Sequence, residues 1–437
     1  YKEKEITMVA TTSEGKVSVF STKEDDINSI CRTPVEKERL SKLLDEAEEQ
    51  SKRKKIVRTK NSSPLLKYLI LWKIRFHYGI HWNKPLYPFR LARNVLLGKF
   101  YNMFDIKKHV LRGLEFAGTY KCNFTCNHCL CSRIDETSTR REMSPEDYRR
   151  VTKEAMKLGA TTFGLEGGEP FVTKEWDKII EACQPKYNHI IISTNGYLFD
   201  EKKAKRCAEL GVDTINFSLD SGIPELHDAF RRKRGSFELV VKGIKLCKKY
   251  KIKIIINTVV HKGNIYTDGF RKLLEFADRE KVLVNTLLAK GVGSFKNKDA
   301  MLSEEDLQAY ERIIEPYYYV QRHLNYNYGK QFGCPGTKEM INFTPYGDVM
   351  NCANMHIYFG NVCEEPLGVI RERALKETPF GRYHSCFLAD DRDFMEIYYN
   401  KLNEKGYLTI DELTKAIKEY ENKNDKIVYP ELHAMNN

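Results

Sequence analysis

Three cysteines at positions 122, 126 and 129 constrain this chain more than any other feature of its sequence. They lie in the stretch C-N-F-T-C-N-H-C, directly after an apolar run over residues 113–120 that is typical of a β-strand. Three thiolates can ligate an iron–sulfur cluster and leave one iron open to a substrate or cofactor. A zinc site would need four nitrogen or sulfur ligands and would be cramped with His128 in the same loop. The spacing alone leaves both interpretations open.

Composition narrows the class of protein and its compartment. The 437 residues can form two or three domains with large cores. The twelve cysteines are scattered along a Lys-rich chain, which is not the pattern of a secreted disulfide scaffold. We therefore expect a reducing, anaerobic cytoplasm as the location of the protein.

The positive charge is concentrated in one segment. The whole chain has a formal net charge of +12, whereas residues 52–110 contain fifteen Lys or Arg and the single acid Asp105. This basic segment also holds many aromatic residues and is too broken by charge to span a bilayer. It could pack on the next domain with solvated lysines, or it could contact a membrane surface or another anionic ligand, which would make the protein peripheral to the membrane. Binding of nucleic acid is not expected.

Residues 1–55 predict a hairpin, with strands over 6–10 and 16–20, and then a charged helix from about Pro34 that Thr33 caps. This stretch could be a plain extension or a small module that recognises a peptide substrate.

From residue 114 onward, short apolar runs alternate with helical stretches, which indicates parallel strands joined by crossover helices. We predict strands at 114–120, 161–165, 189–193, 214–219, 253–259 and 282–288, with a helix over 144–158 that Ser144 caps. The sequence therefore predicts an α/β fold with an open or partial barrel of six βα units. In such barrels, the chemistry lies at the carboxyl ends of the strands.

Those strand ends carry polar motifs that should converge on one rim. The first strand runs into the cysteine loop, and the next three end in Glu-Gly-Gly-Glu-Pro at 166–170, Ser-Thr-Asn-Gly at 193–196 and Ser-Leu-Asp-Ser at 218–221. Paired glycines allow a backbone to approach a ligand, and Ser, Asn and Asp can bind an amine, a carboxylate and ribose hydroxyls.

Together with His227-Asp228 and Arg231, these motifs make the chain resemble the radical S-adenosylmethionine (radical SAM) enzymes that carry a C-terminal SPASM or Twitch extension. The resemblance covers about residues 114–393. It implies that Cys122, Cys126 and Cys129 hold a [4Fe-4S] cluster whose open iron binds SAM. The remaining residues that it implies as contacts of SAM are His128 near the adenine, Gly167, Gly168 and Glu169 at the amine, and Ser193, Asn195, Ser218, Asp220 and Arg231 near the ribose and carboxylate. Cys131 is not expected to be a ligand.

A second cysteine set follows the barrel. Cys334 and Cys352 flank a predicted hairpin with Pro-Tyr-Gly-Asp at its turn, which resembles the start of a SPASM or Twitch domain. The resemblance implies one auxiliary [4Fe-4S] cluster held by Cys334, Cys352 and Cys386. Cys363 could supply the fourth ligand or return a hydrogen atom to a substrate radical. The expected domains are an N-terminal extension (1–112), the barrel (113–325), the auxiliary domain (326–395) and a helical tail (396–437).

The resemblance implies an enzyme that cleaves SAM reductively and removes a hydrogen atom from a substrate, with flavodoxin or ferredoxin as reductant. A ribosomally made peptide that is crosslinked, epimerised or oxidised is the expected substrate. A lipid, lipid-linked or anionic small molecule is the alternative, because of the basic segment. An alternative from another functional class is a non-catalytic protein that binds metal or nucleic acid.

Overall fold

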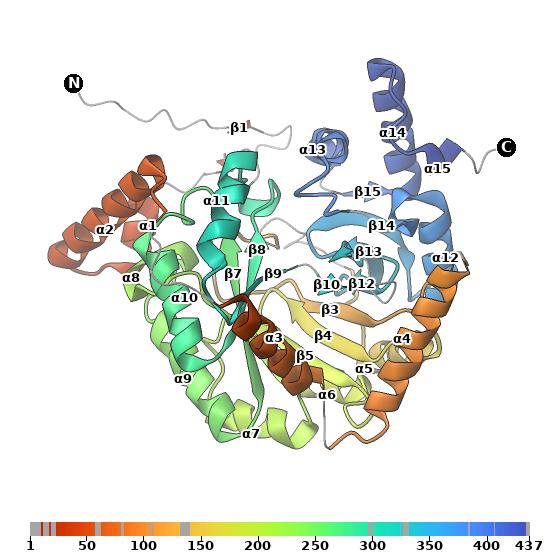
Figure 1. The fold of residues 1–437 in the computed structure, drawn as a ribbon, viewed down its shortest axis with the longest axis horizontal. Helices are drawn as coiled ribbons and strands as arrows, with labels where there is room; N and C mark the ends of the chain where they lie inside the picture. Colours follow the sequence, from red (N-terminus) through yellow and green to blue (C-terminus); the bar gives the residue numbers. More distant parts are fainter. Residues whose placement is uncertain are drawn as a thin grey trace.

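The computed structural model describes residues 10–11, 17–18, 23–56, 63–79, 83–104, 106, 108–131, 140–295, 300–323, 325–326, 332–382, 385–405 and 407–433. One large sheet runs through the centre of the molecule, with helices along its outer side (Figure 1). The α/β architecture predicted from the sequence is confirmed.

The sheet has eleven strands in the order β15-β14-β13-β12-β3-β4-β5-β6-β7-β8-β9. The strands from β3 to β9 are all parallel. Their bounds are β3 Gly113–Thr119, β4 Thr162–Gly167, β5 His189–Thr194, β6 Thr214–Ser218, β7 Lys253–Val260, β8 Leu283–Leu288 and β9 Val320–Arg322. The first six agree with the predicted strands to within one or two residues at each end, whereas β9 was not predicted.

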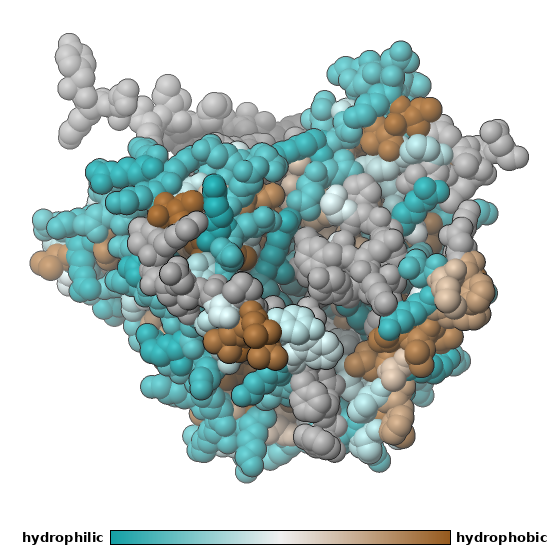
Figure 2. Space-filling view, in the orientation of Figure 1, coloured by the Kyte–Doolittle hydropathy of each residue, from teal (hydrophilic) through white to brown (hydrophobic). Residues whose placement is uncertain are grey.

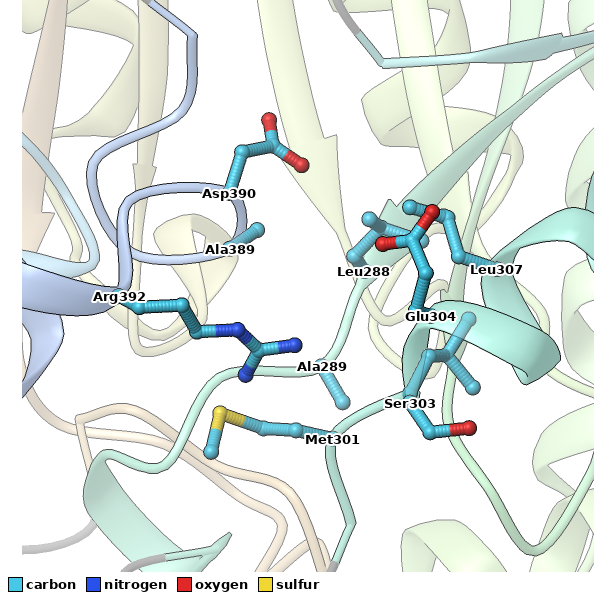
Figure 3. A pocket seen from close by; sticks show the side chains of 10 residues that line it. Leu288, Ala289, Met301, Ser303, Glu304, Leu307, Ala389, Asp390 and Arg392 are labelled. Carbon is cyan, nitrogen blue, oxygen red and sulfur yellow. The ribbon is translucent and has the colours of Figure 1, made fainter.

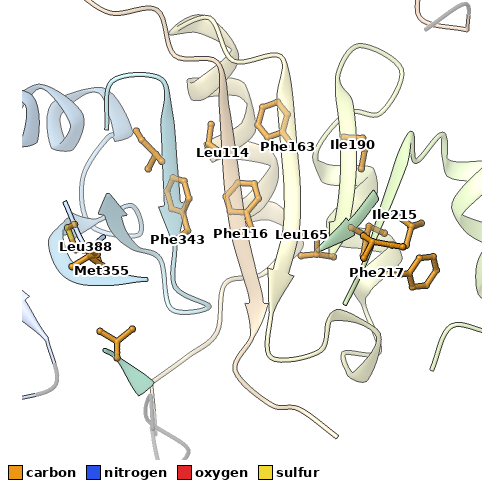
Figure 4. Close-up of a cluster of buried hydrophobic side chains, with 14 of the residues drawn as sticks. Leu114, Phe116, Phe163, Leu165, Ile190, Ile215, Phe217, Phe343, Met355 and Leu388 are labelled. Carbon is orange, nitrogen blue, oxygen red and sulfur yellow. The ribbon is translucent and has the colours of Figure 1, made fainter. Parts of the chain in front are cut away.

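Successive side chains of a strand point to opposite faces of the sheet, and the two faces differ here. Leu114 and Phe116 of β3 and Phe163 of β4 are buried in the main hydrophobic cluster (Figure 4). Glu115, which lies between Leu114 and Phe116 in the strand, points to the other, inner face of the sheet and is partly exposed. The strand β7 shows the same alternation along its full length. The outer face therefore forms the core, and the inner face is reached by solvent.

Helices connect the parallel strands and cover their outer face. The first of them, α5, begins after Ser144, whose hydroxyl accepts a hydrogen bond from the N–H of Asp147 while the Asp147 carboxylate accepts one in return, so the predicted cap is present. The helices of this region are α5 Pro145–Lys157, α6 Trp176–Ala182, α7 Glu201–Leu210, α8 Pro224–Arg231, α9 Ser236–Lys249, α10 Asp268–Glu280 and α11 Glu304–Ile314.

The C-terminal region continues the same sheet. The strand β12 (Met340–Phe343) pairs in parallel with β3 and forms the predicted hairpin with β13 (Asp348–Cys352). The strands β14 (Met355–Asn361) and β15 (Leu408–Thr409) extend this edge. The short strands β10 (Asn325–Tyr326) and β11 (Phe332–Gly333) pair separately. The helices are α12 Leu367–Glu377, α13 Arg392–Lys405, α14 Ile410–Asn424 and α15 Pro430–His433.

The N-terminal region is mostly helical. The short strands β1 (Ala10–Thr11) and β2 (Val17–Ser18) pair antiparallel, and the rest of the predicted hairpin lies outside the described residues. The helices are α1 Lys23–Ile30, α2 Pro34–Arg53, α3 Pro64–Gly79 and α4 Tyr87–Met103. Thr33 caps α2 as predicted.

Candidate active site

The cysteine loop begins at the carboxyl end of β3 and is held in place by two other segments. The N–H of Asn127 donates to the carbonyl of Phe230 in α8 at 3.1 Å, and the N–H of Ser294 donates to the carbonyl of Cys129 at 2.8 Å. Of the three cysteines of the motif, Cys122 is exposed, Cys126 is buried and Cys129 is partly exposed. The loop is therefore anchored on the rim that the sequence predicted.

The two glycines after β4 allow this close packing. A Cβ atom on Gly168 would lie 2.2 Å from the carbonyl oxygen of Lys121, and one on Gly167, whose φ is +122°, would lie 2.4 Å from that of Thr119. The N–H of Gly168 donates to Thr119 and that of Glu169 to Lys121. These two glycines therefore lie against the backbone that leads into the cysteine loop. Their predicted contact with the amine of SAM stays a prediction.

Glu169 connects this turn to the next strand. Its buried carboxylate accepts hydrogen bonds from the hydroxyl of Thr194 at 2.8 Å, the N–H of Asn195 at 2.8 Å and the N–H of Phe171 at 3.2 Å. Burial raises the pKa of Glu169 to about 7, although these hydrogen bonds oppose the shift. Both oxygens are used within the protein, so Glu169 positions the rim, and only its backbone remains a predicted contact of SAM.

Asn195 links the third strand end to the cysteine loop. Its Nδ2 donates to Oδ1 of Asn123 at 2.8 Å and lies 3.9 Å from Sγ of Cys122. Ser193 and Ser218 lie on the inner face of the sheet, and Ser193 accepts a hydrogen bond from Asn216 at 3.4 Å. The ends of β4 and β5 therefore meet beside the first cysteine.

Arg231 and Asp220 form a buried ion pair beneath the second cysteine. Nε of Arg231 donates to Oδ2 of Asp220 at 2.6 Å, and Nη1 of Arg231 lies 3.9 Å from Sγ of Cys126. Oδ1 of Asp220 accepts from the N–H of Val259 at 3.0 Å. Although burial raises the pKa of Asp220, the Arg231 guanidinium lowers it to about 2. The Nε edge of Arg231 is thus occupied, and only its outer nitrogens could meet the carboxylate of SAM.

His128 lies in a stack of rings rather than in open solvent. It is parallel to Phe230 at a centroid distance of 4.8 Å, and Phe230 is parallel to His261 at 5.3 Å. Burial lowers the pKa of His128 to about 3, so its ring is neutral. The His128 ring is thus packed against Phe230, and its contact with adenine stays a prediction.

The helix α1 contacts the cysteine loop directly, which the sequence did not predict. Oδ2 of Asp26 accepts from Nδ2 of Asn127 at 2.8 Å, and Oδ1 of Asp26 accepts from Nε of Arg232 at 2.9 Å. Next to these bonds, Ile30 packs with Ala229 of α8 in a small hydrophobic cluster. The N-terminal extension is therefore attached to the loop that carries the cysteines.

We expect Asp26→Ala to loosen this loop, because it removes the carboxylate from two hydrogen bonds, each worth about 1.5–3 kcal/mol when a charged group takes part. Iron should then leave the reconstituted protein several-fold faster than from the wild type, measured with a chromogenic chelator under anaerobic conditions. Glu24→Ala, an exposed acid on the same helix, is the matched control and should not change the rate. Equal rates for Asp26→Ala and wild type would contradict the role of Asp26.

A pair of carboxylates lies on the inner face of the sheet below the rim. Glu115 of β3 and Glu166 of β4 lie on neighbouring strands, with Glu115 opposite Gly164 and Glu166 opposite Ala117. Both are partly exposed, and the charge of Arg112 and a hydrogen bond from Asn342 act on Glu115. Burial raises the pKa of both carboxyls, and the charge of Glu115 adds to the shift in Glu166. The pair is suited to receive a cationic group.

The second cysteine set also comes together. Cys334 follows β11, Cys352 ends β13, and Cys386 lies in the segment before α13. Burial raises the pKa of Cys352 to about 12, and the nearby Cys334 and Cys386 add to the shift. Lys338, buried beside Cys334, donates to the carbonyl of Phe380 at 2.9 Å. Three thiols and a cation in one place are suited to an anionic cluster.

Cys363 lies apart from both sets. It is exposed, and a Cβ atom on Gly347 would lie 3.1 Å from its sulfur. The charged side chains of Asp147, Arg141, Arg150 and Asp348 act on its thiol. Cys363 is beside Gly347, at the other end of β13 from Cys352, which speaks against a role as the fourth ligand, and its role as a hydrogen donor stays a prediction.

A pocket that the sequence did not indicate lies between the barrel rim and the segment after Cys386. Figure 3 shows Leu288 and Ala289 from the end of β8, Glu304 from α11, and Asp390 and Arg392 around it. Asp390 also accepts the N–H of Cys386 at 3.0 Å. The second cysteine set is therefore adjacent to a pocket at the barrel rim.

The three thiols of the cysteine loop are the ligand type of an iron–sulfur cluster. Burial raises the pKa of the Cys126 thiol to about 12, and cluster ligation would replace its proton. The buried Nδ1 of His128 and Nδ2 of Asn123 have no protein partner, so the loop offers polar atoms to a ligand.

The parallel strands and the cysteine loop define an α/β barrel whose rim is suited to hold an iron–sulfur cluster. Residues 117–277 match the family model of the radical SAM superfamily. This region of the chain is therefore a radical SAM domain, and the recognition from its motifs is confirmed for that domain. The domain implies a [4Fe-4S] cluster and SAM as cofactors.

Two curated relatives share this domain. Fe-coproporphyrin III synthase of Methanosarcina barkeri is 29% identical over 45% of this chain, and a probable GTP 3',8-cyclase of Methanosarcina acetivorans is 32% identical over 46% of it. The chain spans 49% and 61% of the lengths of these relatives. The crystal structure of Streptococcus suis SuiB bound to precursor peptide SuiA has a TM-score of 0.52 at 15% identity and covers 91% of this chain and 93% of SuiB. The similarity of fold thus extends beyond the barrel into the C-terminal region.

Proposed function

We propose that this protein is a radical SAM enzyme that removes a hydrogen atom from a C–H bond of a ribosomally made peptide. When bound, the cluster and SAM supply a 5'-deoxyadenosyl radical for this step. The observation that carries the proposal is the position of Cys122, Cys126 and Cys129 on the barrel rim, next to the buried Arg231–Asp220 pair. The three cysteines would hold the cluster.

The other rim residues would shape the site around the cofactors. Glu169 fixes the turn after β4 through three hydrogen bonds, and Asn195 holds Asn123 beside Cys122. Arg231 places a positive charge beside Cys126, which favours the thiolate over the thiol. An auxiliary [4Fe-4S] cluster would be held by Cys334, Cys352 and Cys386, next to the pocket at the barrel rim.

A peptide substrate is supported by two observations. The fold resembles that of SuiB, which was crystallised with its precursor peptide. The carboxyl groups of Glu115 and Glu166 lie on the inside of the barrel, and the causes of the raised pKa of Glu166 are its burial and the charge of Glu115. A Lys or Arg side chain of a peptide would supply a positive charge.

Glu166→Gln should therefore weaken binding of a peptide with a central lysine by about tenfold, because one charge-assisted interaction is lost. The measurement is fluorescence anisotropy with two synthetic peptides that differ only in lysine or norleucine at the central position. The norleucine peptide should bind both proteins alike. Glu209→Gln, an exposed acid on α7, is the matched control. An equal loss for both peptides would show that Glu166 does not recognise charge.

The alternative of a membrane lipid as substrate receives less support from the geometry. The helix α4 in the basic segment is bonded to Gly159, Ala160 and Asn188, which precede β4 and β5. It therefore lies at the amino ends of the parallel strands, opposite the cysteine loop. A lipid held there would be at the wrong end of the barrel for the chemistry.

The test of the proposed function is an anaerobic assay of the reconstituted protein with SAM and dithionite, followed by chromatography for 5'-deoxyadenosine. We expect cleavage of SAM, increased by a lysine-containing peptide. Bound zinc with no cleavage would overturn the proposal. Strongly salt-dependent binding to arbitrary DNA, again without cleavage, would favour the non-catalytic alternative.

A further inference from the structure

The helix α4 is attached to the barrel by its polar side. Arg90 donates from its guanidinium to the carbonyl of Ala160 at 2.7 Å and to that of Tyr187 at 2.8 Å. Just before the helix, Lys84 is buried in an ion pair with Asp213. The side of α4 that faces the protein is therefore held by hydrogen bonds and charge.

The opposite side of α4 is apolar and exposed. The exposed fractions of its large hydrophobic side chains range from 46% to 74%. These residues follow helical spacing along one side and form what we call the α4 stripe, which consists of Leu86, Phe89, Leu96, Phe100, Met103 and Phe104. A surface helix of a soluble protein normally has the reverse arrangement, with its apolar side against the core. The reversal indicates that something apolar covers the stripe.

The neighbouring helix in the sequence, α3, adds to this surface. Its exposed hydrophobic residues are Leu65, Leu66, Tyr68, Leu69 and Trp72. Together, α3 and α4 with its flanking residues hold eleven of the sixteen large hydrophobic side chains that are exposed in the described part of the chain. Figure 2 shows brown areas over both helices on the same face of the molecule. The exposed apolar surface is thus concentrated and not scattered.

The charge around these helices indicates the kind of partner. No Asp or Glu occurs between residues 50 and 104, whereas Lys73, Arg93 and Lys99 on the two helices are exposed. Apolar and aromatic side chains mixed with cations are typical of helices that lie in the interface of an anionic bilayer. No helix among the described residues is long and apolar enough to cross a membrane.

We propose that the α4 stripe and the exposed side of α3 bind the surface of an anionic lipid bilayer. The helices lie in the interface, the apolar rings enter the boundary of the acyl chains, and the cations meet lipid phosphates. Because α4 lies at the amino ends of the strands, the cysteine loop points away from the bilayer. The inference is independent of the proposed substrate.

The test is flotation of the full chain with vesicles of phosphatidylcholine containing 30% phosphatidylglycerol, and with vesicles of phosphatidylcholine alone. We expect binding to the first kind and much weaker binding to the second. Combined Phe89→Glu, Leu96→Glu and Phe100→Glu should reduce binding by at least about tenfold, since apolar burial is lost and repulsion is added. Arg93→Glu should reduce it by about fivefold or more, since about 1 kcal/mol is expected per charge.

The matched control is Val369→Glu with Ile427→Glu, which adds charge at exposed hydrophobic positions far from α4 in the sequence. Circular dichroism should show the same thermal midpoint for the triple variant and the wild type, because the replaced side chains are exposed. Lack of vesicle binding by the wild type would overturn the proposal. A dimer of the wild type that the triple variant dissociates, seen by light scattering, would also overturn it and assign the stripe to contact between copies of the chain.

Discussion

Replacing Cys122, Cys126 and Cys129 together by alanine is expected to remove about four of about eight irons per chain and to abolish formation of 5'-deoxyadenosine. The three cysteines share one loop, so the variant removes every thiolate proposed for the first cluster. The auxiliary set lies on other segments and should keep its iron. Iron and sulfide analysis of the anaerobically reconstituted proteins gives the count, and chromatography gives the product.

Two matched controls separate ligation from loss of a thiol. Cys207→Ala replaces a cysteine buried in the core of the barrel and should leave the iron count unchanged. Cys131→Ala tests the neighbouring thiol, which donates to the carbonyl of Gly167 at 3.5 Å and is not proposed as a ligand. A fall from about four irons to none in the triple variant would remove the auxiliary cluster from the proposal. An unchanged count would show that the loop does not bind a cluster.

Arg231→Met is expected to destabilise the protein without cofactors by about 3–5 kcal/mol, because it leaves the buried carboxylate of Asp220 without its partner. Loss of iron should also become faster, because the positive charge beside Cys126 is removed. Thermal unfolding monitored by circular dichroism measures the first effect, and a chelator assay measures the second. Arg232→Met is the matched control and should lower the free energy of unfolding by less, since Arg232 is more exposed than Arg231.

The pH dependence of the free energy of unfolding should also report on the Arg231–Asp220 pair. Arg231 lowers the pKa of Asp220 from 3.8 to about 2, so the pair stabilises the folded state above about pH 4 and this contribution is lost as the pH falls toward 2. Arg231→Met should lack that contribution. Combining it with Asp220→Asn removes both charges and should recover part of the lost stability. A double variant as unstable as Arg231→Met alone would contradict the proposed cause.

The sequence predicted the parallel strands well because each is a short apolar run that ends in a polar motif. The strand β5, for example, was expected at 189–193 and is found at His189–Thr194. The cap at Ser144 was predictable for a similar reason, since the serine, the following proline and Asp147 are close in sequence. Local chemistry was therefore sufficient for most of the barrel.

Contacts between distant residues could not be predicted in this way. No motif in the sequence singled out Asp26, yet it accepts a hydrogen bond from Asn127 in the cysteine loop, about a hundred positions later. The sequence also did not indicate that the missing side chain of Gly168 makes room for the backbone of Lys121. Cys363 follows a family landmark, yet it is beside Gly347, at the other end of β13 from Cys352. In each case, the tertiary arrangement and not the residue type decided the role.

The pairing of β12 with β3 limits how this chain can be divided. The expected boundary at residue 325 separates two units in sequence, but the strands on either side of it share one ladder from Met340↔Gly113 to Phe343↔Phe116. A fragment that stops before β12 would leave the backbone of β3 as a bare sheet edge, which other chains could pair with and aggregate. The C-terminal region is thus part of the barrel's wall, and it cannot be exchanged as a cassette without a substitute strand.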